Sequence, residues 1–232
     1  MQLQVTAARP MKLRLIAGVV LVSLALLRDA SGQDFVNLDF EAANLSAYGA
    51  GPALVPATNA IPGWTAYVGG NPQSNIFYNA ISLGSTSISI LGTNGVPSSL
   101  DGAFSIDLYG GVTATAASIS QTGLVPANAV SIFFKAQYSG PPGGLLVVSI
   151  GGQNIPFFVI ASGQNYTLYG GDVSAFAGQS EQLMFSAPEG NNNYWEIDDI
   201  VFSPSTVPEP IALGLFALGG LLLGLRRFIA SN

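Results

Sequence analysis

The chain has 232 residues with seven lysines and arginines, thirteen aspartates and glutamates, and neither cysteine nor histidine. Without cysteine and histidine it cannot form disulfides, a Ser-His-Asp or Cys-His nucleophile, a thiolate or imidazole zinc site, or a c-type haem attachment. Chemistry in the expected mature region therefore depends on carboxylates, hydroxyls, amides and one lysine.

The first 32 residues have the pattern of a secretory signal peptide. Lys12 and Arg14 precede an uncharged apolar run at 15–27, and small residues at 30–32 form a cleavage site. We therefore expect export, with the mature chain beginning at about residue 33. The alternative is that this segment is retained as an N-terminal anchor.

The expected mature region is strongly acidic. Residues 33–207 contain one basic residue, Lys135, and eleven acidic residues, which gives a formal net charge of −10. Nucleic acid and anionic lipid headgroups are poor partners for such a domain, because binding them requires clustered lysine and arginine. Divalent cations and neutral glycans remain compatible with this charge.

Residues 33–203 are expected to form one domain of short strands, followed by a linker at 204–207. Runs rich in β-branched and aromatic residues alternate with Gly, Pro, Asn and Ser, and no amphipathic helix is evident. Strands at such short intervals predict an all-β fold, an antiparallel β-sandwich of jelly-roll type. The expected strands are 35–41, 64–68, 76–78, 87–91, 103–109, 116–122, 130–138, 145–150, 155–160, 166–168, 182–186 and 194–202.

Four short motifs, at 37–41, 62–64, 119–122 and 195–201, support this fold. Together they resemble the jelly-roll domains of the galactose-binding-like superfamily, which includes many carbohydrate-binding modules. The resemblance implies that the first strand pairs with the last. It is a guide to the fold more than to the function, because one sandwich fold hosts many functions.

Four carboxylates lie on these two terminal strands: Asp39 and Glu41 on the first, and Asp198 and Asp199 on the last. The resemblance implies that a carboxylate from each strand holds a structural calcium ion. We expect the ligands to be Glu41 and Asp198 or Asp199, since calcium takes six to eight hard oxygen ligands. The alternative is that these are solvated carboxylates at strand ends.

Several aromatic residues stand beside loops rich in glycine and asparagine. Trp64 and Tyr67 are the first candidates for stacking on a sugar face, with nearby amides binding the hydroxyls. The alternative is that Trp64 is a core residue. We expect a non-enzymatic structural or adhesive protein that binds exopolysaccharide, and the alternative is a carbohydrate-active hydrolase that uses Asp and Glu carboxylates.

The C-terminal segment 208–232 has three parts in a fixed order. Pro208, Glu209 and Pro210 precede an uncharged apolar run at 211–225, which ends at Arg226 and Arg227. Fifteen helical residues reach about 22 Å, short of the roughly 30 Å hydrocarbon core of a bilayer. Thinning of the bilayer and snorkelling arginines would close that gap, with the arginines on the cytoplasmic side.

This tail resembles the PEP-CTERM sorting signal of Gram-negative bacteria. The resemblance implies an exosortase, an integral-membrane protease, as a partner that cleaves near the motif. It also implies passage through the inner membrane, display at the cell surface or in the extracellular matrix, and an association with exopolysaccharide and biofilm. The alternative is an ordinary single-span membrane anchor.

Overall fold

The computed structural model describes residues 33–81, 85–112, 115–190 and 193–207. The expected signal peptide at 1–32, and the expected sorting motif, apolar span and arginines at 208–232, lie outside these ranges. Among the described residues, no helix is long and apolar enough to cross a membrane.

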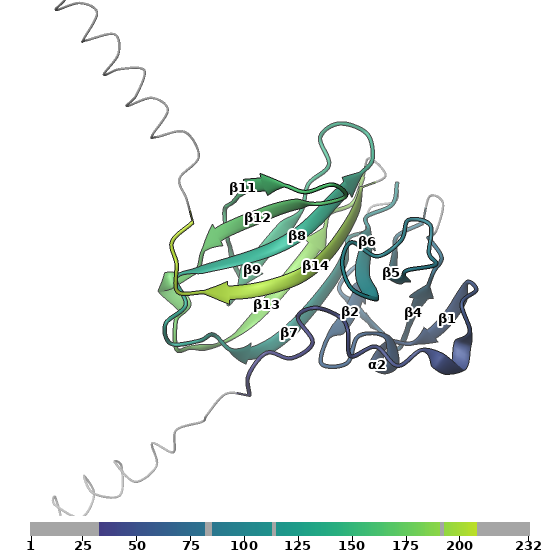
Figure 1. Ribbon diagram of the computed structural model, residues 1–232, viewed down its shortest axis with the longest axis horizontal. Coiled ribbons are helices and arrows are strands. Elements are labelled where there is room, and N and C mark those ends of the chain that lie inside the picture. Colours follow the sequence, from purple (N-terminus) through teal and green to yellow (C-terminus); the bar gives the residue numbers. More distant parts are fainter. Residues whose placement is uncertain (1–32, 82–84, 113–114, 191–192, 208–232) are drawn as a thin grey trace, which may run out of the picture. The chain divides into compact units, whose positions relative to one another are not determined.

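The described chain folds into two facing β-sheets (Figure 1). The larger sheet has eight strands in the order β1-β4-β5-β6-β14-β8-β12-β11. Its neighbouring strands are antiparallel except for β4 and β5, which are parallel. The strands are β1 (Ala53–Pro56), β4 (Asn75–Tyr78), β5 (Ser87–Gly92), β6 (Phe104–Tyr109), β8 (Ser131–Ser139), β11 (Phe157–Ser162), β12 (Thr167–Asp172) and β14 (Tyr194–Ser203).

The smaller sheet has six strands in the order β10-β9-β13-β7-β2-β3. They are β2 (Thr65–Val68), β3 (Asn71–Gln73), β7 (Ala117–Leu124), β9 (Val147–Ile150), β10 (Gln153–Asn154) and β13 (Ser180–Ala187). The short helix α2 (Ala57–Ala60) and two 3-10 turns, η1 (Ser46–Tyr48) and η2 (Ser174–Phe176), complete the described elements.

The connections β6–β7, β7–β8, β12–β13 and β13–β14 each carry the chain from one sheet to the other, as in a jelly roll. Alternate residues of both sheets meet in one core, in which Ile106, Ile197, Phe134, Ile119 and Phe185 are fully buried. The prediction of an all-β sandwich is confirmed.

The segment 35–41 is not the strand that its alternating sequence predicted. Asn37 and Phe40 have φ angles of 51° and 58°, in the left-handed region, and the chain turns there. A single backbone hydrogen bond, from the Ile200 N–H to the Leu38 carbonyl at 3.0 Å, links it to β14. Phe40 is fully buried, so its side chain still contributes to the core.

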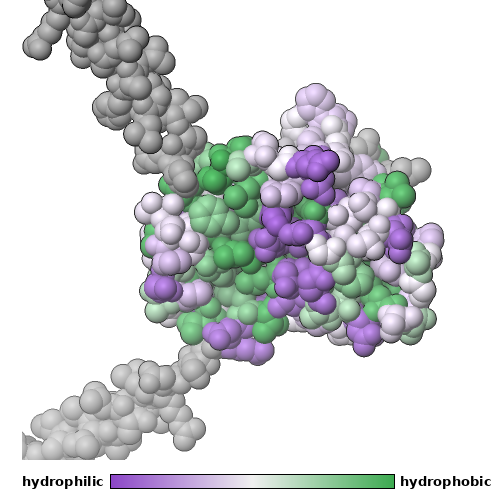
Figure 2. Space-filling model, viewed as in Figure 1, coloured by the Kyte–Doolittle hydropathy of each residue, from purple (hydrophilic) through white to green (hydrophobic). Residues whose placement is uncertain are grey.

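The face seen in Figures 1 and 2 has two kinds of surface. Hydrophobic groups cover the region where β8, β12 and β14 run, and hydrophilic groups gather near the middle of the view. The exposed apolar side chains of the larger sheet include Phe158, Val159 and Val201.

Candidate functional site

The outer face of the larger sheet carries a row of polar side chains. Ile106, Leu108 and Ile197 point into the core, so the residues that alternate with them point away from it. In the strand register, Asp107 of β6 lies opposite Glu196 of β14, and Glu196 lies opposite Gln137 of β8. Three polar side chains from three neighbouring strands therefore meet in one cross-strand row.

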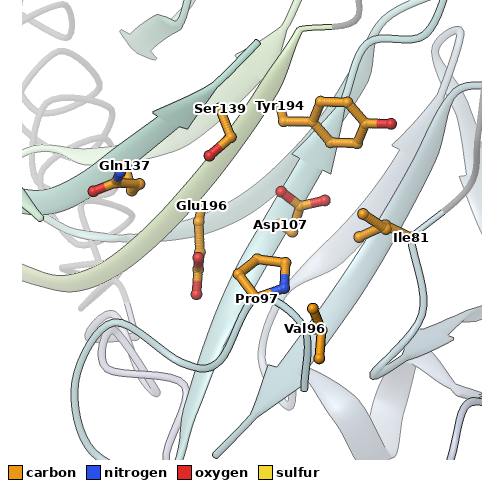
Figure 3. A pocket seen from close by; sticks show the side chains of 8 residues that line it. All are labelled: Ile81, Val96, Pro97, Asp107, Gln137, Ser139, Tyr194 and Glu196. Carbon is orange, nitrogen blue, oxygen red and sulfur yellow. The ribbon is translucent and has the colours of Figure 1, made fainter. Parts of the chain in front are cut away.

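These residues line a pocket of about 460 Å³, within the roughly 300–1,000 Å³ of small-molecule sites. Figure 3 places the two carboxylates side by side on adjacent strands, with Val96, Pro97 and Ile81 approaching from outside the sheet. The pocket thus has a polar floor and an apolar wall. Its lining residues are Ile81, Val96, Pro97, Asp107, Gln137, Ser139, Tyr194 and Glu196.

Both carboxylates on the floor are buried: Asp107 is 3% exposed and Glu196 is 4% exposed. Burial, and then the charge of Glu196, raise the pKa of Asp107 well above its ordinary range. Burial also raises the pKa of Glu196 to about 7, although a hydrogen bond from Ser105 opposes the shift. The Oδ2 atom of Asp107 has no hydrogen-bond partner among the described residues.

An aromatic pair borders the carboxylates. Tyr194 of β14 lies opposite Tyr109 of β6, and their rings stack with centroids 3.9 Å apart and planes 6° apart. Tyr109 is fully buried and Tyr194 is half-buried in the pocket lining. Burial raises the pKa of the Tyr194 hydroxyl, as does its hydrogen bond with Tyr109. The stack fixes the Tyr194 ring at the edge of the pocket.

Val96 and Pro97 of the pocket wall belong to the connection between β5 and β6, which two carboxylates hold in place, whereas Ile81 belongs to the connection between β4 and β5. Glu41 Oε1 accepts hydrogen bonds from the backbone N–H groups of Ala103 and Phe104, at 2.7 and 3.0 Å. Asp198 Oδ2 accepts another from the backbone N–H of Asp101 at 3.1 Å. The acidic residues that the sequence placed at a metal site thus anchor this connection.

Lys135, the one basic residue of 33–207, ties the same connection to the sheet. Its ammonium group forms ion pairs with Asp101 and, at 3.0 Å, with Asp199. Asn165 adds a hydrogen bond from its side-chain amide to the Leu100 carbonyl at 3.0 Å. These contacts hold the β5–β6 connection against β8 and the turn between β11 and β12.

Calcium binding at Glu41, Asp198 and Asp199 stays a prediction. Burial, together with the charges of Asp199 and Glu41, raises the pKa of Asp198 to about 8. However, no group of three or more metal-ligating acidic residues is close enough to hold an ion in the described part of the chain. Asp199 is also already paired with Lys135. A melting temperature that falls on chelation would support a calcium site.

The structure does not bring Trp64 and Tyr67 together. Trp64 is 5% exposed, contacts the rings of Phe40 and Phe185, and donates a hydrogen bond to the Asn37 carbonyl at 2.9 Å. Its indole therefore offers no open face for a sugar, and we leave it out of the proposed site. Tyr67 is half-buried on the opposite face of β2 from the core residue Ala66.

The pocket residues Asp107, Glu196 and Gln137 were not among the site residues expected from the sequence. A signal for them existed, because Asp107 and Glu196 both interrupt apolar strands at positions that alternate with core residues. What the sequence could not give is the strand register that sets them opposite each other.

No family model matches this chain, and no curated protein matches it. Among solved structures, TmCBM61 in complex with β-1,4-galactotriose is 13% identical, with a TM-score of 0.41, over 74% of this chain and 98% of that one. The family 11 carbohydrate-binding module from Clostridium thermocellum, with a mixed-linked tetrasaccharide, is 11% identical, with a TM-score of 0.36, over 66% and 95%. The enzymatically active domain of bacteriophage CBA120 tailspike protein 4 is 15% identical, with a TM-score of 0.35, over 61% and 19%. These likenesses carry neither a ligand nor an activity over to this chain.

Proposed function

We propose that this chain is an exported, non-enzymatic protein that binds a glycan, such as an exopolysaccharide, in the pocket over β6, β8 and β14. The observation that carries the proposal is the combination of Asp107, Glu196 and Gln137 with the Tyr194 ring in one cavity. A sugar has hydroxyls around its ring and an apolar face. Carboxylates and amides bind the hydroxyls, and an aromatic ring packs on the apolar face.

Replacing Tyr194 with alanine is expected to weaken glycan binding by about tenfold or more. The ring would bury apolar surface against a sugar, and losing roughly 1.5–3 kcal/mol corresponds to at least that factor. The measurement is affinity electrophoresis of the full-length chain, in mild detergent, through gels containing different polysaccharides. Melting temperatures establish that each variant is folded.

Tyr67→Ala is the matched control, because it removes a half-buried tyrosine from the other sheet. It is expected to migrate like the wild type. Loss of retardation in Tyr67→Ala but not in Tyr194→Ala would place the glycan on the smaller sheet and refute the pocket as the site.

A hydrolase is the second candidate, and the pairing of Asp107 with Glu196 favours it. Side chains directly opposite on antiparallel strands have Cβ atoms about 4.5–5.5 Å apart, and retaining glycosidases use two carboxyl groups at about 5–5.5 Å. Release of reducing sugar from a polysaccharide, abolished in Asp107→Asn and in Glu196→Gln, would establish this function in place of binding alone.

We further propose delivery through the C-terminal signal, on the grounds of its three-part sequence. An exosortase-type membrane protease would recognise Pro208-Glu209-Pro210 while the apolar run and Arg226-Arg227 hold the chain in the membrane. The chain would then reach the cell surface or the extracellular matrix.

Glu209→Ala is expected to abolish processing, because it removes the single carboxylate of the motif. The measurement is the mass and the membrane fraction of the chain in a host that has an exosortase. Processing of Glu209→Ala at the rate and to the mass of the wild type would instead indicate an ordinary membrane anchor.

A further inference from the structure

The floor of the pocket holds two carboxylates and no cation from the described residues. Ser105 donates a hydrogen bond to Glu196, and the Oδ2 atom of Asp107 has no partner among the described residues. Lys135, the only basic residue of 33–207, is engaged with Asp101 and Asp199. When both carboxylates are ionised, no cation among the described residues balances their charge, so a ligand that carries a positive charge would stabilise the ionised pair.

Burying a charged group without a partner is costly, and two neighbouring carboxylates also repel each other. A hydroxyl can donate a hydrogen bond to Asp107 but leaves the net charge unchanged. An ammonium group donates three hydrogen bonds and carries the opposite charge, so it relieves both penalties together. The neighbouring Tyr194 ring also suits a cation, because cations are attracted to aromatic faces.

Resting on the proposed glycan-binding function, we infer that the pocket recognises an amino sugar whose amine is free and protonated. The Asp107 and Glu196 carboxylates bind the ammonium group, and Tyr194 packs beside the sugar ring. Gln137 and Ser139 lie next to Glu196 and Tyr194 in the strand register, where they bind hydroxyls.

Two other cationic ligands fit the pocket less well. A divalent ion needs more hard ligands than two carboxylates supply, and no cluster of three occurs among the described residues. A lysine side chain would bring the charge, but its alkyl chain has no hydroxyl groups for Gln137 and Ser139 to bind. An amino sugar brings both the ammonium group and the hydroxyls, and its apolar ring face suits Tyr194 and the wall of Val96 and Pro97.

The test is calorimetric titration of the full-length chain with four probes: the trimer of glucosamine, the trimer of N-acetylglucosamine, cellotriose and trilysine. The glucosamine trimer is expected to bind at least tenfold more tightly than the acetylated trimer and cellotriose. Asp107→Asn and Glu196→Gln should each remove most of this preference. Asp34→Asn, which removes an exposed carboxylate outside the pocket, should keep it.

The preference should also depend on pH. The groups around the pocket that titrate are Asp107 and Glu196, with Tyr109 and Tyr194 beside them, while Gln137, Ser139, Val96 and Pro97 are uncharged. Affinity for the glucosamine trimer should rise between pH 5 and pH 7 as Glu196 ionises. Affinity for cellotriose should not follow this rise.

The outcomes separate this inference from the function on which it rests. Equal affinity for glucosamine, N-acetylglucosamine and glucose trimers would overturn the amine inference while leaving glycan binding intact. Binding of trilysine as tight as that of the glucosamine trimer would overturn it in favour of a cationic peptide. Failure of these trimers and of every polysaccharide in the gels to bind would overturn both.

Discussion

Replacing Trp64 with alanine is expected to lower the free energy of unfolding by about 3–5 kcal/mol, as large-to-small changes of buried aromatic residues do. The indole is 5% exposed and contacts the rings of Phe40 and Phe185 in the core. Its removal also leaves the Asn37 carbonyl without the hydrogen bond from the indole N–H. The segment 35–41 should therefore loosen together with the core.

Urea unfolding of the full-length chain measures this loss, with the fluorescence of the buried Trp195 as the probe in the variant. Tyr67→Ala is the control, because Tyr67 lies three residues after Trp64 on β2, and loss of its half-buried ring should cost about 1 kcal/mol. If Trp64→Ala unfolded like the wild type but lost glycan binding, Trp64 would be a ligand-binding residue and its assignment to the core would be wrong.

The second large effect is a loss of stability as the pH rises from about 5 to 8. Glu196 and Asp198 have folded-state pKa values raised to about 7 and about 8, from ordinary values of 4.5 and 3.8, chiefly by burial. Between the ordinary and the raised pKa, the folded chain binds more protons than the unfolded chain, so the stability falls with rising pH. For Glu196 alone, the difference between its ordinary and its folded-state pKa corresponds to roughly 3 kcal/mol in the free energy of unfolding.

Urea unfolding at pH 5 and pH 8 measures this dependence. Both pH 5 and pH 8 lie above the lowered pKa values of Asp101 and Asp172, so these two carboxylates stay ionised at both. Glu196→Gln is expected to reduce the pH dependence, leaving the share of Asp198, and to be more stable than the wild type at pH 8. A wild type that is equally stable or more stable at pH 8 would contradict the burial of these charges.

The sequence predicted the fold well because strand signals are local. Eleven of the twelve expected segments overlap strands of the structure. The strands that it missed, β1, β3 and β10, are two to four residues long and lie at sheet edges. The prediction of a strand at 35–41 was wrong, because Asn37 and Phe40 adopt left-handed backbone angles that turn the chain. The alternation of apolar and polar residues in the sequence does not reveal these angles.

The site was predicted less well because it depends on pairing between distant strands. Asp107 and Glu196 are 89 residues apart in the numbering, and they meet only through the register of β6 with β14. Glu41 and Asp198 were expected to be calcium ligands. In the structure, their carboxylates accept hydrogen bonds from backbone N–H groups of the β5–β6 connection. Nothing in the sequence around Trp64 indicated whether its indole is buried in the core or exposed to a ligand.

The most direct test of a glycan site on the larger sheet is an amide chemical-shift map of the chain during titration with a polysaccharide fragment that it binds. We expect the largest changes at Asp107, Gln137, Tyr194 and Glu196, with little change at Tyr67. Changes centred on Tyr67 and β3, with the pocket residues unaffected, would contradict it and move the binding surface to the smaller sheet.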